Sequence, residues 1–463
     1  MVKHEEKPAV TGQEQQPLWR YIPHRQFARP RTSAREEVRK GLLGLWAQLW
    51  NKHQPHETQS THTDLRHLSH SLRDRIAPVP DWTVLRSALD EALSSWLDDS
   101  PSAARLQIVI GTPYSGTHEA LNHWAAAHNL FLLDPPNTED LLAGNNTWFD
   151  HLPQDVATPL VLPSLEQCYL RHTHGLLLIR QFLQWLVHRP GRCVLGCSSW
   201  AWIYLSKAVG INTLFPAPLI LEALDGERLQ AWFSQLAEDS EMQPIVFRQA
   251  DNGHFVIPPG KPDDPETAPA EQGDHRELST FLTDVAAHSR GNPGVAWAIW
   301  RYSLSRLPDQ DMAEHAGHDT ETVWVKPWQQ IRLPTPPSPC NHSELFVLQA
   351  VLLHDGLTTQ ALTLSLPSAA FEIQCALTRL LQLDVLEMVQ QHWRVSPLAY
   401  PAVREMLASR SFWWTKIINR VCSTITTQWL RPNRLPTGDF HEHRLAFAPA
   451  RPLSAQSFSL RLR

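Results

Sequence analysis

Short apolar runs and helical patterns alternate through the middle of this chain. The runs Leu106–Ile110, Pro159–Leu162 and Arg192–Leu195 have the length and composition of buried strands. The segments that follow them place apolar residues at three- and four-residue spacing, as over Gly175–Val187. Strands that alternate with helices in this way predict an α/β fold, in which a parallel sheet is covered by helices on both faces.

Other patterns flank this region. An amphipathic helix is predicted over Trp82–Leu97, whereas residues 1–60 are expected to be loosely ordered apart from a short amphipathic stretch at Glu36–Trp50. Gln243–Ile257 predicts a β-hairpin, because an Asp-Asn-Gly sequence stands at its turn. The Pro-rich, acidic stretch 258–275 predicts a surface loop.

The last third of the chain is predicted to be mainly helical. Helices are predicted at Glu277–Ser289 and Val295–Leu304, on either side of the turn RGNPG at 290–294. A Pro-rich linker at 333–339 then leads to 343–407, whose pattern predicts three helices, two strands joined by a turn, and a closing helix. This order of elements is typical of a winged helix.

These shifts in pattern divide the chain into five predicted parts. They are a basic, partly disordered N-terminal segment, a degenerate P-loop α/β core, a β-hairpin with an acidic loop and a helical lid that holds the GNP turn, a winged-helix domain, and a basic aromatic helix with a disordered tail. Their boundaries are 1–78, 79–240, 241–335, 336–410 and 411–463.

A glycine-containing loop, GTPYSGTH, joins the first buried strand to a helix. Its glycines have the spacing of a P-loop, GxxxxGK[ST], whose backbone N–H groups wrap the phosphates of a nucleotide at a helix N-terminus. Thr117 stands at the lysine position, and His118 at the position of the hydroxyl that binds Mg²⁺. A plain strand-to-helix turn is the alternative interpretation. The predicted nucleotide-binding residues, with ATP or ADP as the ligand, are Gly111, Thr112, Pro113, Tyr114, Ser115, Gly116, Thr117 and His118.

The acidic residue that normally ends the Mg²⁺-binding strand is also missing. The second strand runs into Pro163 and Ser164, and Glu166 follows shortly after. Glu166 could replace the missing acid, or it could be a residue favoured by the dipole of a helix N-terminus. The third strand ends in Ser198 and Ser199, which would serve as a polar sensor or as a helix cap.

The order of these segments resembles the STAND/AAA+ group of P-loop NTPases over roughly residues 105–410. The most specific matches are the GNP turn at 291–293, with Arg290 before it, and the P-L-x-L-x-x-L run at Pro218–Leu224. Between the loop and the GNP turn stand LPSLEQCYLRHTHGLLLIRQFLQWL, CVLGCSSWAWIYL and FPAPLILEALDGERLQAWF, and the winged-helix pattern follows. The resemblance implies a nucleotide domain followed by a helical lid.

Three departures from the family concern the residues that handle Mg²⁺ and the γ-phosphate. They are the loop lysine, the loop hydroxyl and the strand acid. Without them Mg²⁺ and the γ-phosphate lack their usual ligands, so we do not expect hydrolysis, although the loop backbone could still bind a nucleotide. We therefore predict a non-hydrolysing regulatory or scaffolding protein without a bound metal. The alternatives are an ATPase that uses Glu166 and Arg290 as atypical catalytic residues, and a winged-helix transcription regulator.

Charge is distributed unevenly along the chain. Residues 1–52 hold ten Lys or Arg against five Asp or Glu, and 410–463 hold nine against two, although the net charge of the whole chain is −6. Both ends are therefore basic and the body is acidic, so the ends could seek an anionic partner or remain solvated.

The segment Phe412–Leu430 contains three Trp, no acid and flanking arginines. An aromatic basic helix of this kind predicts association of 410–434 with a protein partner, a membrane surface or a membrane channel, or packing on its own chain. DNA is not the expected partner, because the predicted recognition helix over 368–382 offers Arg379 as its single basic residue.

The cysteines and the hydropathy of the chain indicate the cellular compartment in which the protein is expected. The scattered cysteines are expected to be buried free thiols in a reducing compartment, and their spacing is not that of a zinc site. No apolar run is long enough to span a bilayer, and the N-terminus has no signal-peptide pattern. We expect a cytoplasmic protein, and the alternative is a protein attached to the inner face of the membrane. The cysteines are Cys168, Cys193, Cys197, Cys340, Cys375 and Cys422.

Overall fold

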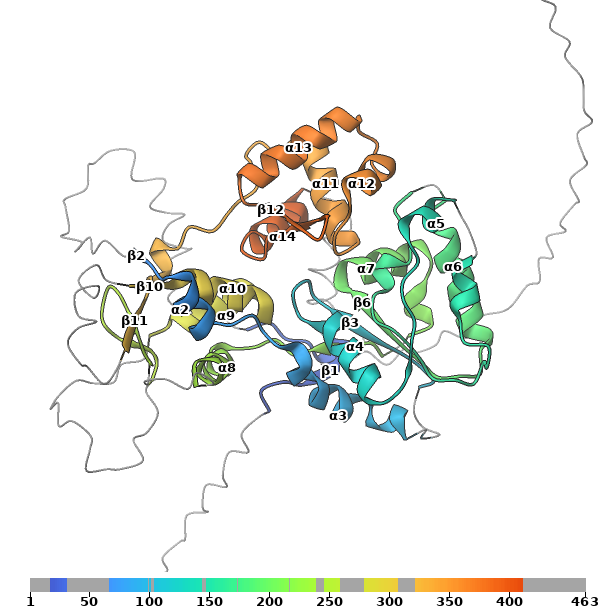
Figure 1. The fold of residues 1–463 in the computed structure, drawn as a ribbon, viewed down its shortest axis with the longest axis horizontal. Coiled ribbons are helices and arrows are strands. Elements are labelled where there is room, and N and C mark those ends of the chain that lie inside the picture. Colours follow the sequence, from blue (N-terminus) through green and yellow to red (C-terminus); the bar gives the residue numbers. More distant parts are fainter. Residues whose placement is uncertain are drawn as a thin grey trace, which may run out of the picture. The chain divides into compact units, whose positions relative to one another are not determined.

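The fold is taken from a computed structural model of the whole chain (Figure 1). The residues that it describes are 17–30, 66–98, 100, 104–143, 147–172, 174–215, 217–238, 245–258, 279–306 and 321–410. They belong to one compact unit, Met1–Ser423, whereas the second unit, Thr424–Arg463, lies outside them. The sequence-predicted stretch Glu36–Trp50, nearly all of the acidic loop 258–275, and the aromatic segment Phe412–Leu430 also lie outside them.

A six-stranded sheet forms the centre of the fold, in the order β1-β7-β3-β6-β5-β4. β1 pairs with β7 antiparallel, and every other pair in this sheet is parallel. The predicted α/β class with a parallel sheet is therefore confirmed. The strands are β1 (Tyr21–Pro23), β3 (Leu106–Gly111), β4 (Phe131–Leu132), β5 (Leu160–Leu162), β6 (Cys193–Ser198) and β7 (Leu219–Leu221).

Helices cover both faces of this sheet because its strands are apolar on both sides. Val109, Val161 and Val194 bury one face together with Leu89 of α3 and Trp124 of α4. The alternate strand residues bury the other face with α6 and α7. The helices of this region are α3 (Arg86–Leu97), α4 (Thr117–Ala127), α5 (Thr138–Ala143), α6 (Leu177–His188) and α7 (Ser199–Ala208). Two further helices, α2 (His70–Ile76) and α8 (Gly226–Glu238), contact each other, and α8 packs on the lid helix over Phe281–Ser289 (Figure 1).

A second sheet has the order β2-β10-β11-β8-β9. It contains the predicted hairpin, whose strands pair antiparallel, and its turn includes Gly253 at φ 72°. The sequence analysis missed the three strands that extend this hairpin. The strands are β2 (Arg66–His67), β8 (Ile245–Gln249), β9 (Phe255–Ile257), β10 (Leu304–Arg306) and β11 (Glu321–Val325), and the two predicted lid helices are α9 (Phe281–Ser289) and α10 (Pro293–Ser303).

The segment 343–407 contains its predicted elements in the predicted order. The first helix begins at a capping box, in which the Asn341 side chain accepts from the Glu344 N–H and the Glu344 carboxylate accepts from the Asn341 N–H. The elements are α11 (His342–Leu353), α12 (Thr359–Ser365), α13 (Ala370–Gln382), β12 (Leu386–Val389), β13 (His392–Val395) and α14 (Tyr400–Ser409).

Two sequence expectations are wrong in detail. Residues 17–30 are not loosely ordered, because β1 pairs with β7 and thereby extends the central sheet. Cys375 is exposed, since it lies on the outer face of α13, whose buried face is formed by Ile373, Ala376, Leu377 and Leu380. The predicted burial is confirmed for Cys168, Cys193, Cys197 and Cys340, and Cys422 lies outside the described residues.

The helices of the described ranges are short. None of them combines the length and the apolar composition needed to cross a membrane.

Candidate functional site

The predicted P-loop lies at the carboxyl end of β3, in the middle of the parallel sheet. β3 pairs with β7 on one side and with β6 on the other, and the loop leads directly into α4. Gly116 caps α4 in the left-handed conformation (φ 70°). Crevices at the carboxyl ends of parallel strands are the usual ligand sites of such sheets, and a helix N-terminus favours an anion. Gly111–His118 therefore lies where a phosphate-binding loop would be expected in a parallel sheet.

A cavity of about 250 Å³ opens beside this loop. The ends of β5 and β6 line it through Glu166 and Ser198, and the C-terminal segment lines it through Asp355 and Arg394. All eight of the predicted loop residues, 111–118, also face it. The structure thus gathers residues that lie more than two hundred positions apart around one candidate site.

The side chains at the two catalytic positions of the loop are engaged within the chain. The Thr117 hydroxyl lies 2.9 Å from the hydroxyl of Ser115. His118 uses both ring nitrogens, since Nδ1 bonds to the hydroxyl of Ser164 and Nε2 lies 3.0 Å from Asn122 Nδ2. Neither residue offers a cation of the kind that the P-loop lysine supplies.

Glu166 is the acidic residue nearest to the position of the missing strand acid. Its side chain is 4% exposed, and Oε2 accepts a 2.8 Å hydrogen bond from the backbone N–H of Ser198. Burial, helped by the neighbouring charge of Asp355, raises the pKa of Glu166 to about 8 in spite of that hydrogen bond. The carboxyl group is therefore mainly protonated at neutral pH.

The turn between α9 and α10 is hydrogen-bonded to the loop. Asn292 Nδ2 donates to Thr112 Oγ1 at 2.9 Å and to the Pro113 carbonyl at 2.6 Å, while Oδ1 accepts from the Val295 N–H. Gly294 packs so closely that a Cβ atom there would lie 2.1 Å from the carbonyl oxygen of Tyr114. The GNP turn, singled out in the sequence, therefore holds the shape of the loop.

The C-terminal segment reaches the same loop from the other side. Tyr114 adopts φ 67°, and its hydroxyl donates to the carbonyl of Val395 in β13. Arg394 lies in the cavity near Asp355, with their closest N and O atoms 3.7 Å apart. Sequence reasoning missed Asp355 and Arg394, because no local motif marks residues that reach a site from a distant part of the chain.

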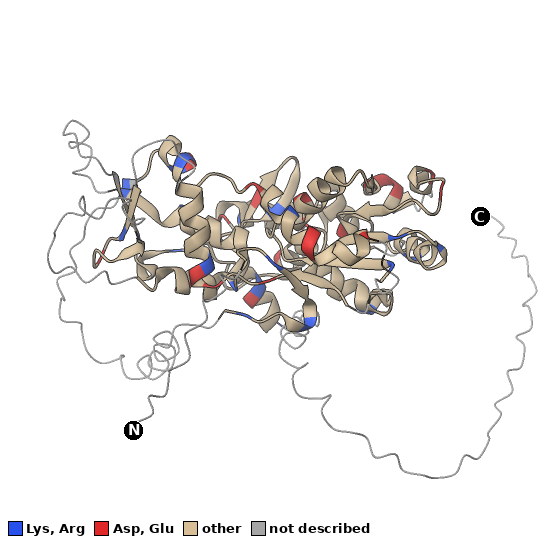
Figure 2. Cartoon of the chain, turned by 90° about the horizontal axis from the view of Figure 1, so that it is seen from below, with Lys and Arg blue, Asp and Glu red and all other residues tan. Residues whose placement is uncertain are grey.

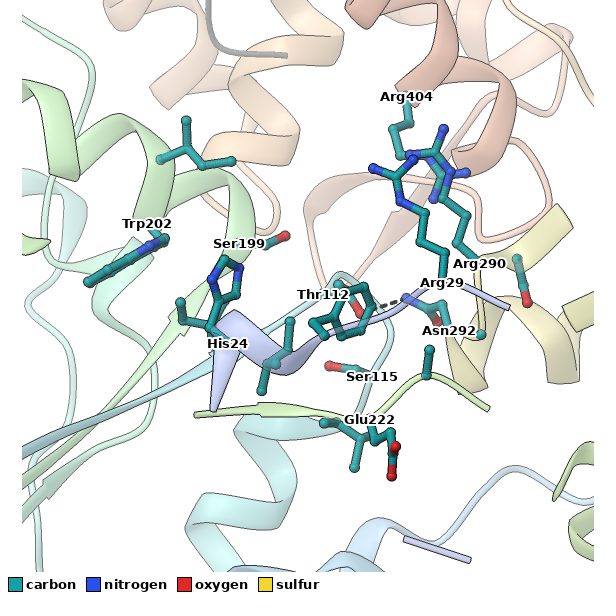
Figure 3. Close-up of a pocket in the computed structure, with 18 of the residues that line it drawn as sticks. His24, Arg29, Thr112, Ser115, Ser199, Trp202, Glu222, Arg290, Asn292 and Arg404 are labelled. Atoms are coloured by element: carbon teal, nitrogen blue, oxygen red, sulfur yellow. Dashed lines mark hydrogen bonds between the residues drawn. The ribbon is translucent and has the colours of Figure 1, made fainter. Parts of the chain in front are cut away.

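The second catalytic candidate, Arg290, lies elsewhere. It lines a different cavity, of about 170 Å³, together with Asn292 and residues that follow β1 (Figure 3). Thr112 and Ser115 line both cavities. The structure therefore does not bring Arg290 and Glu166 into one cavity.

Gly116→Ala should destabilise the fold by about 2 kcal/mol, since a Cβ atom adds both backbone strain at φ 70° and a 2.1 Å contact with the Trp82 ring. Gly253→Ala is the matched control. Its φ is 72° but nothing lies within 4 Å, so it should cost only about 1 kcal/mol. Urea unfolding of the two variants measures the difference, and equal losses would contradict the close packing of Trp82 on the loop.

Neither family models nor curated proteins match this chain. Among solved structures, the RuvB Holliday junction branch migration motor of Thermotoga maritima is 13% identical with a TM-score of 0.28, over 66% of this chain and 91% of that one. ORC2 of Aeropyrum pernix, in ADPNP–ADP complexes, is 12% identical with a TM-score of 0.34, over 75% and 96%. Cdc6p of Pyrobaculum aerophilum is 10% identical with a TM-score of 0.28, over 73% and 95%. Because these TM-scores are low, no site, ligand or activity of the three proteins is assigned to this chain.

Proposed function

We propose that this chain is a nucleotide-binding regulatory or scaffolding protein of the STAND/AAA+ type that does not hydrolyse its ligand. The observation that carries the proposal is that the loop lies in the right place but its two key side chains are bonded within the chain. Gly111–His118 has the position of a phosphate-binding loop at the end of β3, yet the side chains of Thr117 and His118 are bonded within the chain. Backbone N–H groups at the start of α4 would hold ATP or ADP phosphates.

Glu166 supports the absence of hydrolysis. A protonated carboxyl group is a poor ligand for Mg²⁺ and cannot act as a base toward water. Its pKa of about 8 leaves it mainly in this form at neutral pH. The site would therefore hold a nucleotide without a ready means of activating water.

Arg394 is the residue best placed to take over the charge of the missing lysine. It lines the loop cavity, and its Nε is buried without a hydrogen-bond partner. Arginine binds phosphate oxygens through two parallel N–H groups, so it can neutralise a phosphate without a P-loop lysine.

Arg394→Gln should weaken nucleotide binding about tenfold, the loss expected when a charged hydrogen bond is removed. Calorimetric titration of the full chain with MgATP and with ADP measures this, with hydrolysis followed in parallel. Arg86→Gln, on the exposed start of α3 and outside both cavities, is the matched control and should bind like the parent. Binding without turnover supports the proposal, whereas turnover above the blank, or no nucleotide binding at all, contradicts it.

One observation favours an atypical ATPase as the second candidate function. The Glu166 carboxyl group lies in the loop cavity and is oriented by Ser198 at the end of β6. Under this alternative, hydrolysis would rise as the pH passes through about 8, because the carboxylate is then formed. The same hydrolysis assay at several pH values decides between the two functions.

Transcription regulation through a winged-helix domain has less support. Arg379, the single basic residue of α13, donates to the buried Glu344 carboxylate at 2.8 Å instead of projecting freely. Figure 2 shows basic and acidic residues interspersed over the described elements. We propose a protein partner instead, with attachment of 410–434 to a membrane surface or a membrane channel tested by co-sedimentation with liposomes.

A further inference from the structure

The outward side of α13 is uncharged along its centre. Phe371, Cys375, Thr378 and Gln382 follow one another at four- and three-residue spacing, and all four are exposed, so they form one stripe on the helix, called here the α13 stripe. The opposite side of α13 packs on α11 and α12 (Figure 1). The solvent side of a surface helix normally carries charged residues, whereas this stripe begins with Phe371, which is 79% exposed.

The start of α11 lies along one flank of the α13 stripe. The Ser343 hydroxyl donates to the Glu372 carboxylate at 3.4 Å. One turn or two further along α13, Arg379 donates to the Glu344 carboxylate at 2.8 Å. Glu372 and Arg379 therefore mark the flank of the stripe that faces α11.

The described part of the chain ends at this same flank. Burial and the neighbouring Glu344 raise the pKa of the Cys340 thiol, just before α11, to about 12. The positive charges of Arg410 and Arg379 oppose this rise, because both guanidinium groups lie near the thiol. Arg410 follows the last residue of α14 and is the last described residue, so the chain continues from a point beside the α13 stripe.

The sequence that follows Arg410 is complementary to this surface. Residues 411–423 read SFWWTKIINRVCS, with six large apolar residues, two basic residues and no acid. Glu372 in the first turn of α13 and Asp384 just after its end are both exposed. Two carboxylates thus stand at the ends of an apolar stripe, and they have the opposite charge to the two basic residues of 411–423.

The length of the segment is also sufficient. Thirteen residues give α13 a length of about 20 Å. An extended chain covers up to about 3.3 Å per residue, so the twelve residues from Ser411 to Cys422 can follow the stripe over its whole length.

We propose that residues 411–423 dock on the α13 stripe of their own chain, with Trp413 and Trp414 against Phe371. A partner or a membrane that takes up 410–434 would then have to displace this contact first. The proposal is independent of nucleotide binding at the loop.

Two cysteines make the docking directly testable. Among the described cysteines Cys375 alone is exposed, and Cys422 belongs to 411–423. Mild oxidation of the full chain with copper phenanthroline should join Cys375 to Cys422 within one chain, a bond that requires their Cα atoms to approach within about 7 Å. Peptide mass mapping without reduction detects the bond, and Cys375→Ser should abolish it.

Alkylation of the reduced full chain tests the same contact without forming a bond. The double variant Trp413→Ser/Trp414→Ser should raise the rate at which N-ethylmaleimide modifies Cys375 at least about tenfold, because the segment loses most of its apolar contact with the stripe. Trp429→Ser removes a tryptophan outside 411–423, so this matched control should leave the rate unchanged.

A second pair of variants tests the stripe itself. Phe371→Ser should raise the alkylation rate of Cys422 at least about fivefold, since Cys422 is then released from the helix. The fold should tolerate this change because Phe371 is exposed, and circular dichroism checks that it does. Val84→Ser, at an exposed valine of the short helix η2 (Trp82–Leu85), is the matched control and should leave the rate unchanged.

Three results would overturn the docking. A Cys375–Cys422 bond found only between two chains would assign the stripe to a second copy of the protein. Absence of the bond, or equal Cys375 alkylation rates in the parent and in Trp413→Ser/Trp414→Ser, would show that 411–423 does not cover the stripe. Equal rates combined with co-sedimentation of the parent with anionic phospholipid vesicles would assign the segment to a membrane surface. Nucleotide titration reports separately on the loop.

Discussion

Glu166→Gln should stabilise the fold by roughly 3 kcal/mol at pH 7.5 and by no more than about 1 kcal/mol at pH 5. The native pKa of about 8 lies above the ordinary value of 4.5, because the carboxyl group is buried. Between these two values the unfolded chain has released the proton, whereas the folded chain still holds it. Unfolding therefore becomes easier as the pH rises from about 4.5 to about 8, and the parent loses stability over that window.

Glutamine is suited to this test because it keeps the geometry of the protonated acid. Its side-chain oxygen can still accept from the Ser198 N–H, as Oε2 of Glu166 does at 2.8 Å. The variant removes the proton equilibrium and leaves the volume unchanged. The difference in unfolding free energy between variant and parent should therefore grow with pH.

The parent's stability also depends on pH through His354. The difference in unfolding free energy between Glu166→Gln and the parent is therefore more informative than the parent's own pH dependence. His354 is 3% exposed, and burial lowers its pKa to about 4, while its Nδ1 lies 3.2 Å from the Glu166 carbonyl oxygen. The unfolded chain takes up a proton here below about pH 6.5, so this group reduces stability on the acid side and opposes the trend from Glu166.

The measurement is urea unfolding of parent and variant at pH 5, 6.5 and 7.5. Glu91→Gln, at an exposed position on α3, makes the same chemical change and should alter stability by less than about 0.5 kcal/mol. A Glu166→Gln effect that does not increase with pH would show that Glu166 is ionised in the folded protein. That result would also remove the main support for a non-hydrolysing site.

The sequence predicted those elements whose burial produces a local pattern of apolar residues. β3, β5 and β6 are covered on both faces, so each is a continuous apolar run, and the glycine spacing of the loop is visible without any tertiary contact. β1 has three residues and forms only when β7, about two hundred positions later, provides a partner. Such an edge strand has no intrinsic signal, because strand formation depends on packing and pairing context.

The candidate site shows the same division between local and non-local information. The loop and Glu166 follow directly from the order of strands, and both lie in one cavity. Asp355 and Arg394 reach that cavity from the C-terminal segment, and Arg29 meets Arg290 across the molecule in the second cavity. Charged residues contributed by different segments carry no spacing that a single sequence can reveal, so the structure was required to bring them together.

Asn292→Ala should destabilise the fold by about 3 kcal/mol and release the loop from its present shape. The residue is 6% exposed and makes three hydrogen bonds, two to the loop and one as the N-terminal cap of α10. Loss of the cap costs about 1 kcal/mol, and two buried partners left unsatisfied account for the remainder. Thr358→Ala is the matched control, since Thr358 caps α12 through a side-chain bond to the Ala361 N–H and is not among the residues that line the loop cavity.

Asn292→Asp separates the two roles of the side chain. Aspartate keeps an oxygen for the Val295 N–H but replaces the donor to Thr112 and Pro113 by a second acceptor, which then faces the Pro113 carbonyl oxygen. If Asn292 acts on the loop, Asn292→Asp should weaken nucleotide binding at least as much as Asn292→Ala does, although the cap is retained. Calorimetry on both variants decides this. Nucleotide affinity equal to that of the parent in both would show that the loop keeps its shape without the lid turn, and that the hydrogen bonds of Asn292 serve only to fasten α10 to the core.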